Sequence, residues 1–177
     1  MIENLYTPNC IRTFTGKNVN VIDPDPETIC IEDIAHALSF QCRFGGHLPS
    51  FYTVAQHSCY CARGVAHELR LDALLHDASE AYLLDIPSPV KSQLTNYKEM
   101  EDNLMLAIAD KFGFAYPLDP EVKKIDKELM EWEWKHIMLQ QPSFLMCSIW
   151  DPEKAQLYFL EKYNQYSNTK LKLAQSI

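Results

Sequence analysis

The stretch LLHDASEAYLLDIPSPVK, from Leu74 to Lys91, combines an apolar helical pattern with several ionisable residues. His76 and Asp77 are adjacent, and Glu80 follows them after two small residues. On a helix of 3.6 residues per turn, these three side chains would project from one side. Burying a carboxylate among leucines is costly unless a cation compensates its charge. The stretch therefore predicts a core helix that helps to bind a cation.

Five further helices are predicted on either side of this stretch from apolar spacing and capping signals. The expected ranges, with the central one included, are 31–41, 53–69, 73–84, 96–112, 119–140 and 151–166. Asp119 and Asp151 are each followed by proline, which favours the first position of a helix. Gly113 is typical of a helix end. Before the first helix, residues 14–22 indicate only a short strand or hairpin.

The composition is that of one globular domain, which we expect to span residues 1–177. Hydrophobic residues make up 47% of the chain and charged residues 23%. The net charge of −8 argues against a polymeric nucleic acid as partner but leaves room for a small phosphorylated ligand. With no secretion signal and no apolar run of about 18 residues, we expect a cytoplasmic protein that does not contact membranes.

The six cysteines contain no C-x-x-C pair, and we expect buried, reduced thiols. Cys59 and Cys61 are two residues apart, so on a helix they point about 200° apart and cannot bind one metal ion together.

Two more polar residues lie beside apolar stripes of other predicted helices. His57 faces inward on 53–69, and Asp126 follows Ile125 of the inward stripe on 119–140. A lone inward histidine is more often a hydrogen-bonded core residue than a metal ligand. Together with His76 and Asp77, however, these residues form a set that can bind one divalent cation.

Two imidazoles and two carboxylates suit Mn, Co, Ni, Fe or Zn better than a thiolate site would. Four protein ligands leave coordination positions for water and substrate, as in catalytic centres. Glu80, one turn from the ligands, is then placed to transfer a proton.

The segment CRFGGHLPSFY, residues 42–52, has the composition of a loop. Arg43 offers forked cationic donors, the two glycines permit close backbone approach, and the aromatic residues offer a stacking face. A plain turn with one solvated arginine is the simpler interpretation of this segment by itself.

The order H…HD…D, formed by His57, His76-Asp77 and Asp126, resembles that of the HD-domain metal-dependent phosphohydrolase superfamily. The segment HDASEAYLLDIPSPVK is similar to a block of bacterial 5'-deoxynucleotidases, and residues 29–58 are similar to the amino-terminal half of small prophage-borne HD-domain proteins. The resemblance implies an all-α fold, a helical bundle of about six helices.

The resemblance also implies a role for each matching residue. His57, His76, Asp77 and Asp126 would hold one divalent metal ion (Mn, Co, Ni, Fe, Zn or Mg), and Glu80 would be the catalytic acid or base. The resemblance also implies substrate contacts. Arg43 would contact the phosphate, with His47 and Lys91 as additional phosphate contacts. Asp85 would lie near the sugar, and Phe44 occupies the position where these enzymes usually have a Trp that packs against the sugar.

The expected function is hydrolysis of (deoxy)nucleoside 5'-monophosphates to nucleoside and phosphate. One alternative is a triphosphohydrolase that releases triphosphate from a dNTP, and another is a nucleotide-binding regulatory module without turnover. Trp132, Trp134 and the tyrosines of the last helix are expected in the core or on a homodimer surface.

Overall fold

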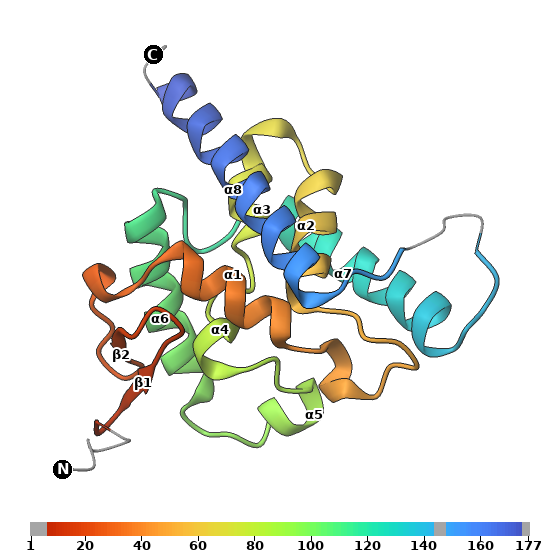
Figure 1. Cartoon of the computed structure of the whole chain (residues 1–177), viewed down its shortest axis with the longest axis horizontal. Coiled ribbons are helices and arrows are strands. Elements are labelled where there is room, and N and C mark those ends of the chain that lie inside the picture. Colours follow the sequence, from red (N-terminus) through yellow and green to blue (C-terminus); the bar gives the residue numbers. More distant parts are fainter. Residues whose placement is uncertain (1–6, 144–147, 175–177) are drawn as a thin grey trace.

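A computed structural model describes residues 7–143 and 148–174, with side chains described as far as residue 170, and the chain is predominantly helical (Figure 1). The described residues form eight α-helices: α1 (Ile31–Phe40), α2 (Val54–Gly64), α3 (Arg70–Leu74), α4 (Glu80–Leu83), α5 (Ser88–Lys91), α6 (Tyr97–Phe112), α7 (Pro120–Glu133) and α8 (Pro152–Ala174). The expected all-α class and helical bundle are confirmed.

A small hairpin precedes the helices. Strands β1 (Cys10–Arg12) and β2 (Asn18–Asn20) pair antiparallel, with Ile11 opposite Val19. Val19 is fully buried and belongs to the main core, so the hairpin packs on the bundle through one side chain of its second strand.

The long helix α8 lies across α1, α2 and α3 (Figure 1). It runs to Ala174, beyond the expected end near residue 166. One core joins these helices to α6, and its fully buried members include Ile34, Leu38, Leu74, Leu104, Ile108 and Phe159. Burial of an aliphatic or aromatic side chain contributes about 1.5–3 kcal/mol, so this shared core is what holds the short helices in place.

The predicted helix starts at Thr53 and Asp119 are confirmed by their caps, whereas α3 begins at Arg70, before the expected start at residue 73. Thr53 accepts a hydrogen bond from the Gln56 N–H at 3.0 Å, and Asp119 accepts one from the Glu121 N–H at 2.7 Å. Gly113 ends α6 in the left-handed conformation, with a φ of 69°.

Two helices end earlier than expected. Helix α2 stops at Gly64 rather than near Leu69, because Val65 is extended and one 3-10 turn, His67–Leu69, follows. Helix α7 ends at Glu133, and the turn Trp134–Met138 widens to a π-helix. Single π turns of this kind are frequent at functional sites.

The largest correction concerns the predicted helix 73–84, which is two short helices joined by a turn over residues 75–79. His76 and Asp77 lie in that turn, not on a helix face. His76 Nδ1 donates to the Ala73 carbonyl at 2.8 Å, so that carbonyl accepts a side-chain bond at the point where a continuous helix would use it for the Asp77 N–H. The bonds from Ala78 N–H to Leu75 and from Glu80 N–H to Asp77 then follow the tighter three-residue spacing.

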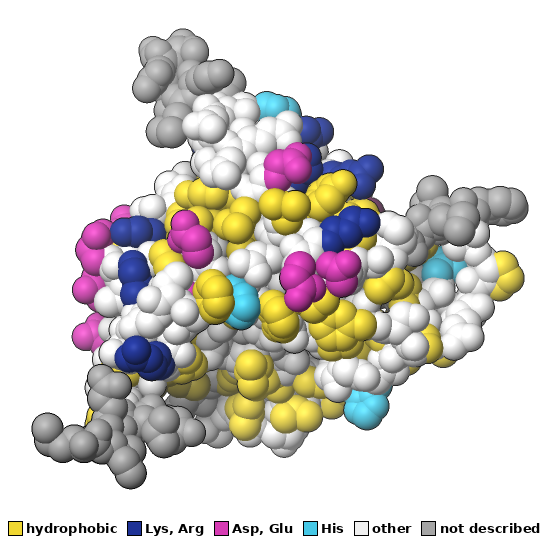
Figure 2. All heavy atoms as spheres, viewed as in Figure 1, with side chains coloured by type: hydrophobic (Ala, Val, Ile, Leu, Met, Phe, Trp, Pro, Cys, Tyr) yellow, Lys and Arg dark blue, Asp and Glu magenta, His cyan; other side chains and the backbone are white. Residues whose placement is uncertain are grey.

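The surface carries several exposed apolar side chains, among them Phe14, Phe40 and Leu157. Figure 2 shows hydrophobic side chains across the face over α1 and α8. The homodimer stays a prediction.

Among the described helices, none is long and apolar enough to cross a membrane. The cytoplasmic location and the single-domain organisation also stay predictions. Five cysteines are free thiols in the described structure, and Cys147 lies outside the described residues.

Candidate metal centre

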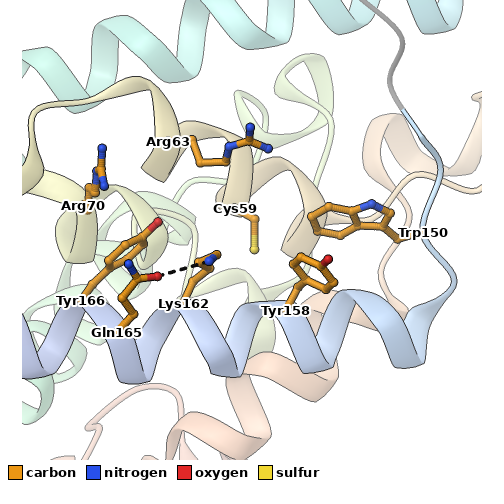
Figure 3. A pocket seen from close by; sticks show the side chains of 8 residues that line it. All are labelled: Cys59, Arg63, Arg70, Trp150, Tyr158, Lys162, Gln165 and Tyr166. Carbon is orange, nitrogen blue, oxygen red and sulfur yellow. Dashed lines mark hydrogen bonds between the residues drawn. The ribbon is translucent and has the colours of Figure 1, made fainter.

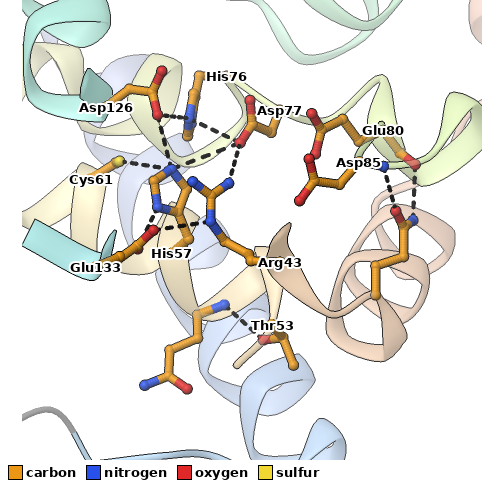
Figure 4. A network of polar contacts seen from close by, with 12 residues as sticks. Arg43, Thr53, His57, Cys61, His76, Asp77, Glu80, Asp85, Asp126 and Glu133 are labelled. Carbon is orange, nitrogen blue, oxygen red and sulfur yellow. Dashed lines mark hydrogen bonds and ion pairs between the residues drawn. The ribbon is translucent and has the colours of Figure 1, made fainter. Parts of the chain in front are cut away.

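Three separate elements bring the predicted ligands together (Figure 4). His57 comes from the middle of α2, His76 from the turn after α3, and Asp126 from α7. Asp126 Oδ1 lies 3.1 Å from His57 Nε2 and 3.6 Å from His76 Nε2. A single ion placed among these atoms would contact residues that lie as far as 69 positions apart in the chain.

Asp77 completes the predicted set. Its Oδ2 lies 3.1 Å from His76 Nε2 and 3.8 Å from His57 Nε2. The same oxygen lies 3.7 Å from Arg43 Nη1, so Asp77 stands between the histidines and the arginine.

Cys61 is a possible ligand that sequence reasoning missed. Its Sγ lies 3.4 Å from His57 Nε2, and its side chain is fully buried. One ligand atom from each of His57, Cys61, His76 and Asp126 lies within 4.8 Å of all the others. The four-residue spacing from His57 to Cys61, which puts both side chains on one side of a helix, is the sequence signal for this ligand.

Glu133 is the second residue that was missed, and it is fully buried. Its Oε1 lies 2.7 Å from His57 Nδ1 and accepts a bond from the Tyr52 hydroxyl at 2.8 Å, and its Oε2 accepts one from Arg43 Nε at 3.1 Å. A carboxylate on Nδ1 orients the imidazole so that Nε2 faces the ligand cluster. The seven-residue spacing from Asp126 to Glu133 on one helix is the sequence signal for this pair.

The charges in the cluster are strongly coupled. Burial disfavours the charged form of His57 and His76, yet the surrounding carboxylates raise the pKa of both imidazoles well above the usual value. Burial also raises a carboxyl pKa, but His76 and His57 lower the pKa of Asp77 to about 2, and the hydrogen bond from His57, together with the charges of both imidazoles, holds the pKa of Asp126 far below its usual range. The cluster therefore favours positive charge at its centre, which protons or a metal ion can supply.

The donor set fits a divalent transition metal. Because His76 Nδ1 donates to Ala73, the neutral imidazole keeps its lone pair on Nε2, which is buried and forms no hydrogen bond with a described residue. Asp77 Oδ2 lies 3.1 Å from that nitrogen, within ion-pair distance, but the two atoms do not form a hydrogen bond. A buried nitrogen that forms no hydrogen bond with a described residue, and that lies beside two carboxylates, an imidazole and a thiol, is suited to bind a metal ion.

Glu80 lies next to the cluster, at the start of α4. It is 7% exposed, and its Oε2 has no hydrogen-bond partner among the described residues. Burial, together with the charges of Asp77 and Asp85, raises its pKa well above the usual value. A raised pKa favours the protonated carboxyl, which is the form that a general acid requires.

Gln41 ties Glu80 to Asp85. Its Nε2 donates to the Glu80 carbonyl at 2.8 Å, and its Oε1 accepts from the Asp85 N–H at 3.0 Å. Between them, Leu84 has a φ of 69° and a ψ of 153°, a backbone conformation that residues other than glycine rarely adopt. This bend turns Asp85 toward the site, and burial raises the pKa of the Asp85 carboxyl.

A pocket of about 190 Å³ opens beside the ligands. Lys91 lines it, with its Nζ 2.9 Å from Glu101 Oε1 and 4.0 Å from Glu80 Oε1. Its other lining residues are His76, Asp77, Ser79, Glu80, Glu101, Met105, Tyr116, Leu118, Val122, Lys123 and Asp126. Lys91 is thus placed where the prediction requires a cation.

The predicted loop residues divide into two groups. Arg43 is buried in the network, paired to Glu133 and Asp77. Phe44 adopts a φ of 55° and lies 5.8 Å from the Trp134 ring, and His47 is exposed. Neither residue contacts the ligand cluster within the described part of the chain, so their substrate roles stay predictions.

No family model matches the chain. The chain is 41% identical over 134 residues to the uncharacterized protein YfdR of Escherichia coli (strain K12), an alignment that covers 76% of this chain and 75% of YfdR. It is 36% identical over 126 residues to an uncharacterized protein of Rhodobacter capsulatus, covering 66% of this chain and 64% of that protein.

Proposed function

The chain belongs to the family of Escherichia coli YfdR, and from its site we propose that it is a metal-dependent phosphohydrolase of the HD-domain type. We propose that it hydrolyses (deoxy)nucleoside 5'-monophosphates. The proposal rests on one observation: the ligand atoms of His57, His76 and Asp126 converge beside a pocket into which the buried carboxyl of Glu80 projects.

The residues divide the chemistry between them. His57, His76, Asp77 and Asp126 would hold the metal ion, with Cys61 in reach. When bound, a divalent ion supplies Lewis-acid stabilisation of negative charge and acidifies water.

Glu80 is the proton donor in this proposal. Its raised pKa favours the protonated carboxyl, which can donate to the leaving oxygen of a phosphate ester. Lys91, 4.0 Å from Glu80, can bind a phosphoryl oxygen once substrate displaces part of its pairing with Glu101. Arg43 is fixed by the ion pair of its Nε with Glu133. Its Nη1 lies 3.7 Å from Asp77, on the side of the guanidinium that faces the ligand cluster.

The size of the pocket supports a monophosphate. Pockets that enclose drug-sized ligands have volumes of roughly 300–1,000 Å³. A volume of about 190 Å³ accommodates a phosphoryl group and adjoining sugar atoms more readily than a triphosphate. The base would then lie at the mouth of the pocket.

The test is a phosphate-release screen with metal-stripped protein, resupplied with Mn, Co, Ni, Fe, Zn or Mg, over ribo- and deoxyribonucleoside mono-, di- and triphosphates. We expect metal-dependent phosphate release from monophosphates. Glu80→Gln should lower kcat by about 10²–10⁴-fold, the usual contribution of a general acid, without loss of bound metal. Glu99→Gln, on an exposed position of α6, is the control.

The same screen separates the alternatives. Triphosphate released from a dNTP would assign the site to triphosphohydrolase chemistry. Nucleotide binding without turnover by any metal-loaded form would favour a regulatory module. Unchanged turnover in Glu80→Gln would refute the role of this carboxyl.

A further inference from the structure

A second pocket lies between α8 and the pair α2 and α3, and it shares no lining residue with the metal centre (Figure 3). Its volume is about 460 Å³. It is lined by three cationic side chains, three aromatic side chains, a thiol and an amide: Arg63, Arg70, Lys162, Trp150, Tyr158, Tyr166, Cys59 and Gln165. We call it the basic groove.

The cations of the basic groove are largely unneutralised. Neither Arg63 nor Arg70 forms an ion pair with any residue whose side chain the structure describes, and Arg70 Nε is buried without a hydrogen-bond partner there. Lys162 contacts Glu161 Oε1 at 3.2 Å, but the Glu161 side chain is 60% exposed, so the pair is weak. The buried carboxylate of Asp72, on α3, is already paired to Lys170.

This surplus of positive charge is unexpected in a chain whose net charge is −8. Two of the four arginines of the whole sequence line this one pocket. Three cations that line one pocket with only a weak counterion favour an anionic ligand there.

The aromatic side chains give the basic groove a stacking wall. Trp150 is 7% exposed and packs between Tyr60 and Tyr158, whereas Tyr158 is 38% exposed and is the ring on which a ligand can stack. At the other end, the Arg70 guanidinium lies 5.9 Å from the Tyr166 ring. Aromatic rings next to arginine and lysine are the combination on which bases stack while phosphates are bound.

The floor of the basic groove carries no negative charge to oppose an anion. Cys59 is 2% exposed, and burial raises the pKa of its thiol to about 12, although Lys162 and Arg63 act to lower it. The thiol is therefore neutral at physiological pH.

We propose that the basic groove is a second ligand site, which binds a nucleoside phosphate independently of the metal centre. The phosphates would contact Arg63, Arg70 and Lys162, and the base would stack on the exposed ring of Tyr158, which Trp150 supports from behind. A volume of about 460 Å³ lies within the range of pockets that enclose small ligands.

The experiment titrates ATP, as the probe, into the 177-residue chain in excess chelator, and binding is measured by calorimetry and by intrinsic tryptophan fluorescence. We expect one metal-independent site with a Kd below about 1 mM. Adenosine, which lacks the anion, and tripolyphosphate, which lacks the ring, should each bind more weakly than ATP. Binding should weaken as salt is raised, because the cations are accessible to solvent.

Arg63→Ala and Lys162→Glu should each weaken ATP binding about tenfold or more, because each removes a charge-assisted contact to phosphate. Lys127→Ala, an exposed cation on α7 outside the basic groove, is the matched control and should bind as wild type does. Circular dichroism checks that each variant is folded.

His76→Ala separates this proposal from the proposed function. We expect it to abolish phosphohydrolase activity and to leave ATP binding in chelator unchanged. Three results would overturn the second site: no ATP binding at millimolar concentration, equal affinity in Arg63→Ala and wild type, or loss of binding in His76→Ala. Inactivity of the metal-loaded protein with ATP binding intact would refute the proposed function alone.

Discussion

The two faces of helix α2 have opposite charge environments. His57 and Cys61 face the metal centre, where Asp126 and Glu133 of α7 approach them. Cys59 and Arg63 face the basic groove, which α8 closes with Lys162 and aromatic rings (Figure 3). One helix of eleven residues therefore separates an anionic, densely paired centre from a cationic, sparsely paired one.

The helix packed against each face of α2 determines the chemical environment of the residues on that face. Cys59 and Cys61 are both buried thiols on one helix. Only Cys61 has imidazole and carboxylate neighbours within ligand distance, because α7 supplies Asp126 on that side.

Glu133→Gln should have the largest effect. It removes the charge that pairs with Arg43 and orients His57, so a buried guanidinium loses its main counterion. Breaking a buried ion pair typically costs about 3–5 kcal/mol. We expect a loss of that order in the free energy of unfolding, measured by urea denaturation in chelator, and weaker metal binding by about 10–100-fold. ATP binding at the basic groove should persist wherever the variant is folded.

Glu131→Gln, two residues earlier on the exposed side of α7, is the control for charge alone. The effect of Glu133→Gln should also depend on pH. Burial raises the Glu133 pKa, but His57 and Arg43 together hold it below its usual value of 4.5. A carboxyl with a lowered folded pKa stabilises the protein above its unfolded pKa. The stability gap between wild type and variant should therefore shrink as pH falls below about 4.5. A gap that widens in acid would contradict the assignment.

Gly64→Ala should have an intermediate effect, confined to the α7 side. A Cβ on Gly64 would lie 2.6 Å from Ile125 Cγ1, so α7 must shift away from α2. Overpacking of this kind costs about 1–3 kcal/mol. We expect lower stability together with weaker metal binding, because Asp126 follows Ile125 on α7. Ile125→Ala in the same chain should restore both; failure to do so would show that the clash is not the cause.

Cys61→Ser should have the smallest effect, and it tests the two faces with matched variants. Cobalt bound to a thiolate gives a charge-transfer absorption in the near ultraviolet that oxygen and nitrogen ligands do not give. Cys61→Ser should abolish that band and lower metal affinity by about tenfold, or 1.4 kcal/mol. Cys59→Ser, two residues away, should leave the spectrum unchanged. The same band in both variants would exclude Cys61 as a ligand.

Local sequence signals predict most of the helices, and they single out His57, His76, Asp77 and Asp126, which the structure brings together. Caps at Thr53 and Asp119 and the stop at Gly113 are local, since each is made by a side chain or a backbone conformation within a few residues. Inward polar residues at His57 and Asp126 were visible because they interrupt apolar stripes. Such signals depend on the spacing of apolar residues along a helix, which can be seen in a single sequence.

The positions of these residues relative to one another depend on tertiary packing. The turn at residues 75–79 depends on a bond from His76 to a backbone carbonyl, which helical periodicity cannot predict. In the sequence, only spacing distinguishes Cys61 and Glu133 from other residues of their helices, and their role depends on the packing of α2 against α7. The cations of the basic groove likewise come from distant positions, such as Arg63 and Lys162. Side-chain chemistry is set by neighbours in space, since charge interactions and burial act across a few ångströms whatever the separation in the chain.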